Sequence, residues 1–461
     1  MKLQFPKIQE TKILEFAKTI QEIGGRAVCV GGCVRDALLG QEPKDIDIEV
    51  FGVDPQILEE ALSQRYEVLP IGKDFGVLSI KQYNIDVSVP RKEFKRGEGH
   101  RGFQINADPN LSFKDAAARR DFTINAISWD PLTDELIDPY YGLEDLQNKI
   151  LRHTSPKFTE DPLRVLRGMQ FIARFELTPD KHTVALSRGI YPENLSKERI
   201  FEEWKKLILL GKKPSLGLKF LKDTHWVIHF PELENLIDCA QDPEWHPEGD
   251  VWSHTLYCMD AFANERIGDE FEDLVVGLAV LCHDFGKPDT TIYDEANYRL
   301  RSPGHDIAGE APTRSFLNSM TDYKDLIESV IPLVVHHLRP VDLFKAQSTD
   351  SAIRRLSRVV RLDRLMRVVS ADMQGRPPKP NTAPEVNKWL MERAEALDIK
   401  NKAPDPIIRG RHLIALGMKQ GAEFRPLLDS CYEAQIEGIF STEEDGLKFL
   451  KATMAESGIT I

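Results

Sequence analysis

The chain has 461 residues, enough for about three domains, and its composition of 41% hydrophobic and 29% charged residues is typical of a globular protein. Its net charge of −13 gives a field that does not attract nucleic-acid backbones, so nucleic-acid binding would require a local basic surface. We find neither an apolar run of about 20 residues, which a membrane span needs, nor a secretory signal, and the scattered cysteines form no C-x-x-C pair. A cytoplasmic protein with reduced thiols and no membrane partner is expected.

The first part of the chain predicts a mixed α/β head, and the remainder is almost wholly helical in its pattern. Apolar spacing predicts a helix over 8–23 that ends at Gly24-Gly25. A buried strand at 27–30, a short helix at 34–39 and strands at 45–51, 77–80 and 85–89 follow. A proline-rich segment at 376–380 is typical of a linker. We expect four parts: a head (1–142), a helical neck (143–215), a helical body (216–380) and a helical tail (381–461).

The strongest local signal in the head is a glycine turn followed by two aspartates. Gly31-Gly32 directly follows the buried strand, and Asp45 and Asp47 lie two residues apart on the next strand, so their side chains share a face. Paired carboxylates repel unless a cation lies between them, and oxygen ligands suit Mg²⁺. The glycines let the backbone approach a phosphate, and Arg35 could neutralise its charge. Either motif alone is more often an exposed strand or a tight turn, but their order favours a phosphoryl-transfer site.

Four ordered motifs in the first 210 residues resemble the class II nucleotidyltransferases, the family of bacterial tRNA CCA-adding enzymes and poly(A) polymerases. They are Gly31-Gly32-Cys33-Val34-Arg35-Asp36 with Asp45-Ile46-Asp47, Arg119-Arg120-Asp121-Phe122-Thr123-Ile124-Asn125-Ala126, Asp138-Pro139-Tyr140-Tyr141-Gly142, and Glu160-Asp161-Pro162-Leu163-Arg164-Val165-Leu166-Arg167.

This resemblance implies an α+β fold whose head is of the DNA polymerase beta type, with Asp45 and Asp47 as catalytic ligands of Mg²⁺. It also implies that Asp121 and Asn125 contact the ribose. Asp86, on a later strand, is a weaker candidate for a third carboxylate because outward-facing aspartates are common on strands. The nucleotide-binding residues that we expect are Gly31, Gly32, Arg35, Arg120, Asp121, Asn125, Asp161, Arg164 and Arg167.

The Asp161–Arg167 segment has both a structural and a functional interpretation. Asp161 is a plausible helix cap before Pro162, which would leave Arg164 as a solvated cation. Alternatively, Asp161 accepts from the exocyclic amine of cytosine or adenine while Arg164 donates to the unprotonated ring nitrogen, which excludes uracil and guanine. The second interpretation agrees with the amino-acid template of the family. The chain departs from that family at Gln170, where an arginine is usual, which leaves one phosphate or base contact in doubt.

Histidines and aspartates in the helical body form a second ordered set. One His-Asp pair is a weak signal, but the order H…HD…H…H…D resembles the HD superfamily of metal-dependent phosphohydrolases. The resemblance implies a divalent transition metal or Mg²⁺ and phosphatase or 2′,3′-cyclic phosphodiesterase activity. The implied ligands are His254, His283, Asp284 and Asp372 for a primary metal, and His305 with one of His336 and His337 for a second.

Two basic segments are candidates for contacts with a phosphate backbone. The arginines at 354, 355, 358, 361, 364 and 367 follow a helical pattern, which is more often a solvated face. The basic residues at 91, 92, 95, 96 and 101, interleaved with glycines, predict a mobile loop near the head.

We expect the protein to add C, C and A in sequence to the 3′ end of tRNA, using CTP and ATP. Poly(A) polymerase is the nearest alternative, although its members usually carry a basic tail and this chain is acidic. An enzyme that adds only CC or only A remains open. A third alternative is a phosphohydrolase whose head only binds nucleotides, against which the intact aspartate and template motifs argue.

Overall fold

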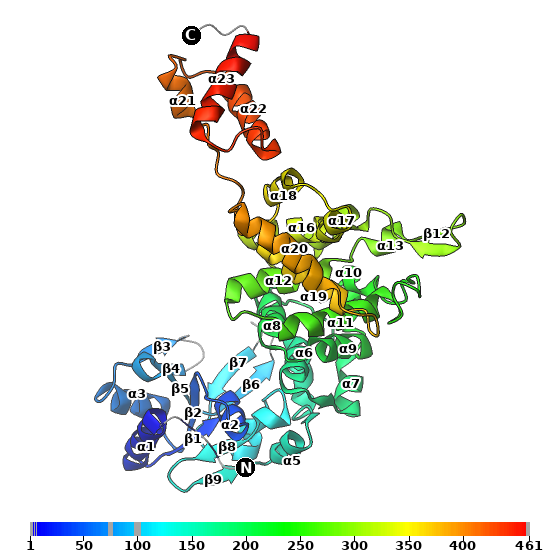
Figure 1. Cartoon of the computed structure of the whole chain (residues 1–461). Helices are drawn as coiled ribbons and strands as arrows, with labels where there is room; N and C mark the ends of the chain where they lie inside the picture. The colour runs from blue at the N-terminus through cyan, green and yellow to red at the C-terminus, as the bar shows by residue number, and fades with distance from the viewer. Residues whose placement is uncertain (1–2, 4, 6, 72–76, 96–102, 458–461) are drawn as a thin grey trace. The chain divides into compact units, whose positions relative to one another are not determined.

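A computed structural model describes residues 3, 5, 7–71, 77–95 and 103–457 of the chain. The chain divides into two compact units, Met1–His229 and Phe230–Ile461, which are coloured by residue number in Figure 1. Among the described helices, none combines the length and apolar character that a membrane span requires. The finer division into head, neck, body and tail stays a prediction.

A seven-stranded mixed sheet forms the centre of the first unit, in the order β3-β4-β5-β2-β1-β8-β9 (Figure 1). Only β2 and β5 are parallel, and every other neighbouring pair in this sheet is antiparallel. Strand β1, an interior strand of this sheet, is apolar from Ala27 to Val30, and all four of these residues are buried. The strands are β1 (Arg26–Val30), β2 (Ile46–Phe51), β3 (Leu69–Ile71), β4 (Val77–Ile80), β5 (Ile85–Ser88), β8 (Ser128–Asp130) and β9 (Glu135–Ile137).

Short helices and one hairpin complete this part of the unit. Helix α1 buries Ile13, Phe16 and Ile20, which confirms the helix predicted over 8–23. The basic segment predicted as a loop instead enters a hairpin of β6 (Arg91–Lys95) and β7 (Phe103–Ala107), and its residues 96 and 101 lie outside the described residues. The helices are α1 (Lys7–Glu22), α2 (Gly32–Leu38), α3 (Pro55–Ser63), η1 (Lys81–Tyr83), α4 (Phe113–Ala117), η2 (Thr123–Asn125) and α5 (Gly142–Gln147).

Helix α6 packs closely against α8 and α9 in the remainder of the first unit. A Cβ atom on Gly168 of α6 would lie 3.0 Å from the ring of Phe220, and one on Gly217 of α9 would lie 2.5 Å from the Met169 carbonyl oxygen. These two glycines therefore permit the close approach of α6 and α9. The elements here are β10 (Ile150–Leu151), η3 (Pro156–Glu160), α6 (Leu163–Phe175), β11 (Thr178–Pro179), α7 (Lys181–Ser187), α8 (Lys197–Leu210), α9 (Pro214–Asp223) and η4 (Trp226–His229).

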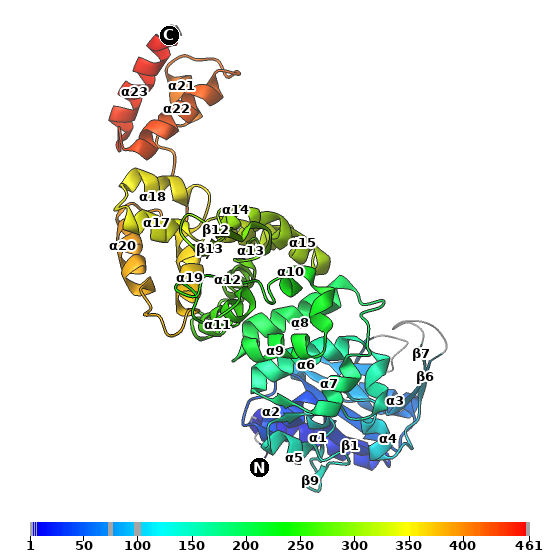
Figure 2. The same ribbon diagram turned by 90° about the vertical axis from the view of Figure 1, so that its right-hand side faces the viewer.

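The second unit is built around α12, which contacts α11, α16 and α19. Helices α11, α12 and α19 lie together in Figure 2. Helix α12 buries residues from Asp273 to Cys282 without a polar face, as expected of a helix that is covered on all sides. The elements are α10 (Pro231–Glu234), α11 (Val251–Asn264), α12 (Glu270–Cys282), α13 (Lys287–Thr290), β12 (Ile292–Asp294), β13 (Arg299–Arg301), α14 (His305–Ala308), α15 (Glu310–Met320), α16 (Lys324–Val335), α17 (Arg339–Lys345), α18 (Asp350–Ser357), α19 (Leu362–Gln374) and α20 (Ala383–Ala396).

The last three helices, α21 (Gly410–Ala415), α22 (Phe424–Glu437) and α23 (Glu443–Glu456), share a small apolar core of their own. Its buried members include Leu413, Leu427 and Leu450.

The arginine run considered as a nucleic-acid contact has partners within the protein. On α19, Arg364 pairs with Glu272 and Arg367 with Asp273, both on α12. The other four contact Asp363, Glu272 and residues of α22. These pairings give the run a structural role in place of the free phosphate-binding face considered from the sequence. The partners of those four are Ile436 O for Arg354, Glu437 for Arg355, Glu433 for Arg358, and Glu272 with Asp363 for Arg361.

Candidate active sites in the two units

Three carboxylates gather at one end of the parallel strand pair in the first unit. Asp45 immediately precedes β2, Asp47 lies on β2, and Asp86 of β5 is the residue in register with Asp47. Burial raises the pKa of Asp47, and Asp86 and Asp45 raise it further, against the opposing charge of Arg120. Such crowding of oxygen ligands fits a hard cation. The strand order brings Asp86, the weaker candidate from the sequence, into register with Asp47.

The glycine turn makes room for an arginine beside Asp47. Gly31 has a φ of 76°, and a Cβ there would lie 2.9 Å from Nη1 of Arg120 and 3.8 Å from Oδ2 of Asp47. The buried Glu49 of β2 accepts from Arg119 Nη2 at 2.8 Å and lies 3.8 Å from Arg120 Nη2. The turn and Glu49 together fix the Arg120 guanidinium next to the carboxylate cluster.

Arg35 is buried and is held by hydrogen bonds and by contacts with two aromatic rings. Its Nη1 donates to Asn125 Oδ1 at 2.5 Å, and its Nε and Nη2 donate to Asp36 Oδ1 at 2.8 and 2.7 Å. The guanidinium carbon lies 4.9 and 4.8 Å from the ring centroids of Phe171 and Phe175. The positive charge expected to meet a phosphate is therefore buried, although the residue still lines the pocket described below.

Asp121 connects the Arg120–Asn125 motif to helix α6. Its Oδ1 accepts from Asn125 Nδ2 at 2.9 Å and from the Phe122 amide at 2.8 Å, and its Oδ2 accepts from Arg167 Nε at 2.7 Å. Burial by itself would raise the pKa of Asp121, but the charge of Arg167 and these hydrogen bonds lower it. The carboxylate is consequently ionised and holds Asn125 and Arg167 in place.

Asp161 and Arg164 each contact other residues of this unit. Asp161 Oδ1 accepts from the Leu163 amide at 3.1 Å, the capping role considered from the sequence, and Oδ2 accepts from Arg199 Nη2 at 2.8 Å. Arg164 Nη1 donates to the Lys157 carbonyl at 2.6 Å. Arg199 comes from α8, and its spacing from Asp161 gave no signal in the sequence.

One pocket of about 470 Å³ is lined by Asp47, Asp121, Asn125, Asp161 and Arg164, among other residues. Gln170, where the family usually has arginine, is buried and accepts from Arg174 Nη1 at 3.3 Å, so Arg174 brings a guanidinium to the pocket from one turn further along α6. Burial and the nearby Arg35 lower the pKa of Arg174. This is a local basic surface of the kind that an acidic chain needs for a polyphosphate ligand. Its cationic residues are Arg35, Arg120, Arg164, Arg167, Arg174, Arg199 and Lys206.

The histidines of the second unit share one hydrogen-bonding arrangement. The Nδ1 atoms of His283, His305 and His337 lie 2.7 Å from the carbonyl oxygens of residues 280, 302 and 334. Because a carbonyl only accepts, each Nδ1 carries the proton and each Nε2 keeps a lone pair, as a metal ligand requires. His337 groups with Asp284 and His305, whereas His336 belongs to none of the possible ligand groups among the described residues.

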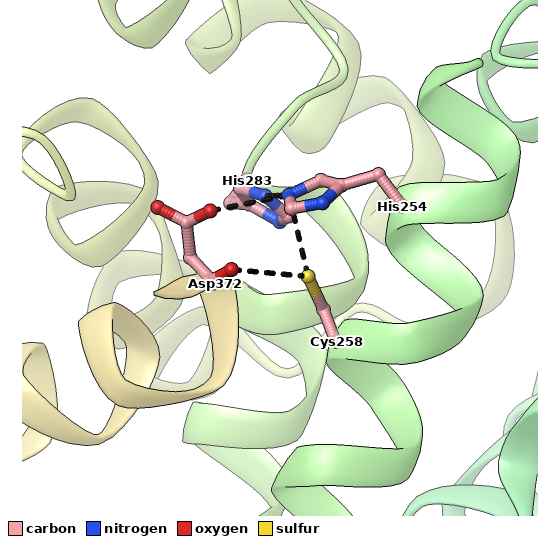
Figure 3. A group of neighbouring side chains, drawn as sticks. All are labelled: His254, Cys258, His283 and Asp372. Carbon is pink, nitrogen blue, oxygen red and sulfur yellow. Dashed lines mark hydrogen bonds and ion pairs between the residues drawn. The ribbon is translucent and has the colours of Figure 1, made fainter. Parts of the chain in front are cut away.

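Asp284 lies between two groups of metal-ligand atoms. Its Oδ2 is 3.3 Å from His283 Nε2, and its Oδ1 is 3.4 Å from His305 Nε2. On the first side, His254 Nε2 lies 3.3 Å from His283 Nε2 and 3.1 Å from Asp372 Oδ1 (Figure 3). This donor set fits one divalent ion on each side of the Asp284 carboxylate.

Glu248 is a buried carboxylate behind this cluster. Its Oε1 lies 2.8 Å from His254 Nδ1 and 2.9 Å from His246 Nδ1, and the Gly375 carbonyl is 3.1 Å from the same His254 nitrogen. Burial would raise the pKa of Glu248, but the hydrogen bonds with His246 and His254 lower it to about 2. A carboxylate at this nitrogen orients a metal-binding imidazole and raises its basicity. The sequence analysis did not identify Glu248; only the short His246-x-Glu248 spacing could have indicated it.

A pocket of about 310 Å³ opens onto the Asp284 cluster. Lys287 Nζ lies 2.7 Å from Asp284 Oδ2, and Arg376 Nη2 lies 3.4 Å from Asp372 Oδ2. Arg376 begins the proline-rich segment expected to be a linker, so this segment starts at the pocket. The cationic lining suits an anionic substrate.

Comparison with known proteins matches both the motifs and the fold. A family model described as the poly A polymerase head domain matches residues 27–152, and one described as the probable RNA and SrmB-binding site of polymerase A matches 191–237. The chain is 36% identical over 367 residues to the multifunctional CCA protein of Xylella fastidiosa strain 9a5c, covering 76% of this chain and 84% of that protein. The chain belongs to the class II family of CCA-adding enzymes and poly(A) polymerases.

Other members of this class II family agree. The multifunctional CCA protein of Stenotrophomonas maltophilia strain K279a is 36% identical over 72% of this chain and 82% of its own length. The CCA-adding enzyme of Bacillus stearothermophilus in complex with CTP superposes with a TM-score of 0.68 at 19% identity, covering 98% of this chain and 99% of that one. The Thermotoga maritima CCA-adding enzyme complexed with tRNA superposes with a TM-score of 0.59 at 18% identity, covering 98% of this chain and 100% of that one. The α+β fold expected from the sequence is confirmed, and nucleotidyltransferases of this family depend on a metal, usually Mg²⁺.

Proposed function

We propose that this protein adds C, C and A to the 3′ end of tRNA from CTP and ATP. The observation that carries the proposal is a single pocket whose lining includes Asp47 of the carboxylate cluster together with Asp161 and Arg164. One cavity thus brings a carboxylate suited to phosphoryl transfer together with a carboxylate and a guanidinium suited to distinguishing bases. The multifunctional CCA proteins that the chain resembles support the same activity.

Asp45 and Asp47, with Asp86 beside them, would hold Mg²⁺, which when bound activates the primer 3′-hydroxyl and stabilises the leaving pyrophosphate. Arg120, held by Glu49 next to Asp47, supplies positive charge to the triphosphate. Asn125, held by Asp121, would contact the ribose. In this proposal the pocket would align nucleotide and primer before any bond is made.

Base choice would rest on Asp161 and Arg164. The Asp161 carboxylate accepts from the amine of cytosine or adenine, and Arg164 donates to their unprotonated ring nitrogen. In the present arrangement Asp161 Oδ2 accepts from Arg199, and Arg164 donates to the carbonyls of Lys157 and Arg119. An incoming base therefore exchanges these contacts for its own, and a uracil or guanine would leave the displaced groups unpaired.

The decisive assay supplies tRNA transcripts that end before CCA, after C, after CC and after CCA with each labelled nucleotide in turn. We expect CTP to extend the first two, ATP to extend the third, and neither to extend the complete end. Repeated addition of A would identify a poly(A) polymerase instead. Extension with CTP but not with ATP would identify an enzyme that adds only CC. Extension of only the CC-ended transcript, with ATP, would identify an enzyme that adds only A.

We further propose that the second unit is a metal-dependent phosphohydrolase. The supporting observation is the pair of ligand groups on either side of Asp284 beside a cationic pocket. His254, His283, Asp284 and Asp372 would hold one ion, and Asp284, His305 and His337 a second. The ions, when bound, supply a Lewis acid for the phosphoryl oxygen. Lys287 and Arg376 would bind the phosphate of a phosphomonoester or a 2′,3′-cyclic phosphate.

Hydrolysis of p-nitrophenyl phosphate and of 2′,3′-cyclic AMP, measured after dialysis against a chelator and reloading with single metals, tests this second function. We expect activity to return with at least one divalent ion. No hydrolysis of either substrate with any metal would reject it.

A further inference from the structure

A cysteine stands among the ligand atoms on the His254 side of the second-unit cluster. Cys258 follows His254 by four residues on α11, so both side chains lie on the same face of that helix. Its Sγ lies 3.3 Å from His254 Nε2, and Figure 3 shows it facing His283 and Asp372. The ligand atoms of all four residues lie within 4.8 Å of one another.

The separations of the other three ligand atoms from His254 Nε2 are close to those expected around one ion. Zinc bonds of about 2.0–2.1 Å to nitrogen and about 2.3 Å to sulfur give tetrahedral edges of roughly 3.3–3.6 Å. His254 Nε2 is 3.3 Å from Cys258 Sγ, 3.3 Å from His283 Nε2 and 3.1 Å from Asp372 Oδ1. The sulfur is therefore as close to His254 as the other ligand atoms are.

A glycine on the neighbouring helix end independently accommodates the thiol. A Cβ on Gly375 would lie 2.2 Å from Cys258 Sγ, and no larger residue fits there without moving the sulfur. The Asp372 carbonyl lies 3.9 Å from the same sulfur. Because Cys258 is fully buried, the packing holds Sγ at the cluster.

We propose that Cys258 is an additional, thiolate ligand of the ion assigned above to His254, His283, Asp284 and Asp372, and that it makes this half of the centre select a transition ion such as Zn²⁺, Co²⁺ or Ni²⁺ over Mg²⁺. The inference rests on the metal centre proposed above. Soft sulfur favours these ions, whereas the Asp284–His305–His337 group offers only nitrogen and oxygen. When the ion binds, the S–H bond breaks, a metal–sulfur bond forms and the proton leaves to solvent.

Cobalt spectroscopy of the full-length protein tests this assignment without relying on activity. After chelation, the protein is titrated anaerobically with Co²⁺ and its visible and near-ultraviolet absorption is recorded. We expect d–d bands and a sulfur-to-cobalt charge-transfer band. Cys258→Ala should retain d–d bands and lose the charge-transfer band. Cys282→Ala, a matched control at another buried cysteine outside the ligand group, should keep both. His283→Ala should remove the charge-transfer band and weaken the d–d bands, because the Asp284–His305–His337 group can still bind Co²⁺.

The outcomes separate the two proposals. Two results would overturn the thiolate assignment and leave the metal centre intact. One is a set of d–d bands that depends on His283 without a charge-transfer band. The other is a charge-transfer band that persists in Cys258→Ala. Absence of any Co²⁺ binding that depends on His283 would overturn both. The spectrum of the unaltered protein answers the question of sulfur ligation even where a variant folds poorly.

Metal preference gives a second readout. Competition with a chelator should show that Cys258→Ala weakens Zn²⁺ binding by on the order of 10–100-fold, with a much smaller effect on Mn²⁺. Equal weakening for both ions would contradict the proposed selectivity.

Discussion

The pocket of the first unit and the cluster of the second both gather carboxylates, but they surround them with different partners. Asp45, Asp47 and Asp86 offer only oxygen, and the pocket beside them is lined by guanidinium groups. The cluster around Asp284 combines carboxylates with imidazoles fixed by backbone carbonyls. The first arrangement suits a hard ion that arrives with a polyphosphate, and the second suits an ion held by the protein itself.

The lining of the two pockets also explains how a chain of negative net charge can bind an anionic substrate. Cationic side chains line both pockets, while other arginines form internal ion pairs, such as Arg364 with Glu272. The negative net charge of the chain therefore does not argue against a phosphate-bearing ligand, because the local field at a pocket acts on a bound phosphate.

The largest expected effect breaks the first site alone. Asp47→Ala should lower nucleotide addition by more than about a thousandfold, because loss of the metal removes several kcal/mol of transition-state stabilisation. Phosphohydrolase activity should be unchanged. Labelled CTP incorporation and p-nitrophenyl phosphate hydrolysis measured on one preparation check both expectations. Near-normal addition by this variant would refute the assignment of the carboxylate cluster.

The converse change breaks the second site. His283→Ala combined with Asp284→Ala should abolish metal-dependent hydrolysis, since two ligand groups are lost from the cluster. Addition of C and A should continue at a near-normal rate. A melting curve accompanies both assays, because metal loss can lower the stability of the second unit. A stable double variant that hydrolyses normally but no longer adds nucleotides would reverse the proposed division.

An intermediate effect sharpens the role of the first pocket in base choice. Asp161→Ala should raise misincorporation of U and G by about 10–100-fold, since a lost base-edge partner costs on the order of 1–3 kcal/mol. Incorporation of C should fall less than discrimination does. Single-turnover assays with each nucleotide measure the ratio. Arg199→Ala is the matched control, because it removes the partner of Asp161 Oδ2 without removing the carboxylate. Unchanged selectivity in Asp161→Ala would reduce this residue to a helix cap.

The smallest expected effect concerns stability. The pKa of Asp121 is lowered in the folded protein, so its contribution is fully present above the ordinary aspartate pKa of about 3.9 and is lost as pH falls through the lower folded value. Asp121→Asn should reduce the free energy of unfolding of the first unit by about 2 kcal/mol at neutral pH, because a charged hydrogen bond to Arg167 disappears. Urea denaturation at neutral and strongly acidic pH should show the difference shrinking with acid. A constant difference would contradict the linkage.

The sequence by itself determined what depends on neighbours along the chain. Alternation on a strand placed Asp45 and Asp47 together, the helix over the first residues followed from apolar spacing, and Gly31 occupies a left-handed turn that its position after β1 indicated. Four ordered motifs were enough for the family and the fold.

Tertiary structure decided what depends on elements distant in sequence. Strand order places Asp86 beside Asp47, and helix packing places Arg199 next to Asp161. After α16, His337 and not His336 joins the Asp284 group. Packing also placed Cys258 against Gly375. Spacing along a chain fixes the face on which a side chain lies, but only the assembled core fixes what lies opposite that face, because long-range pairing leaves no periodic signal in the sequence.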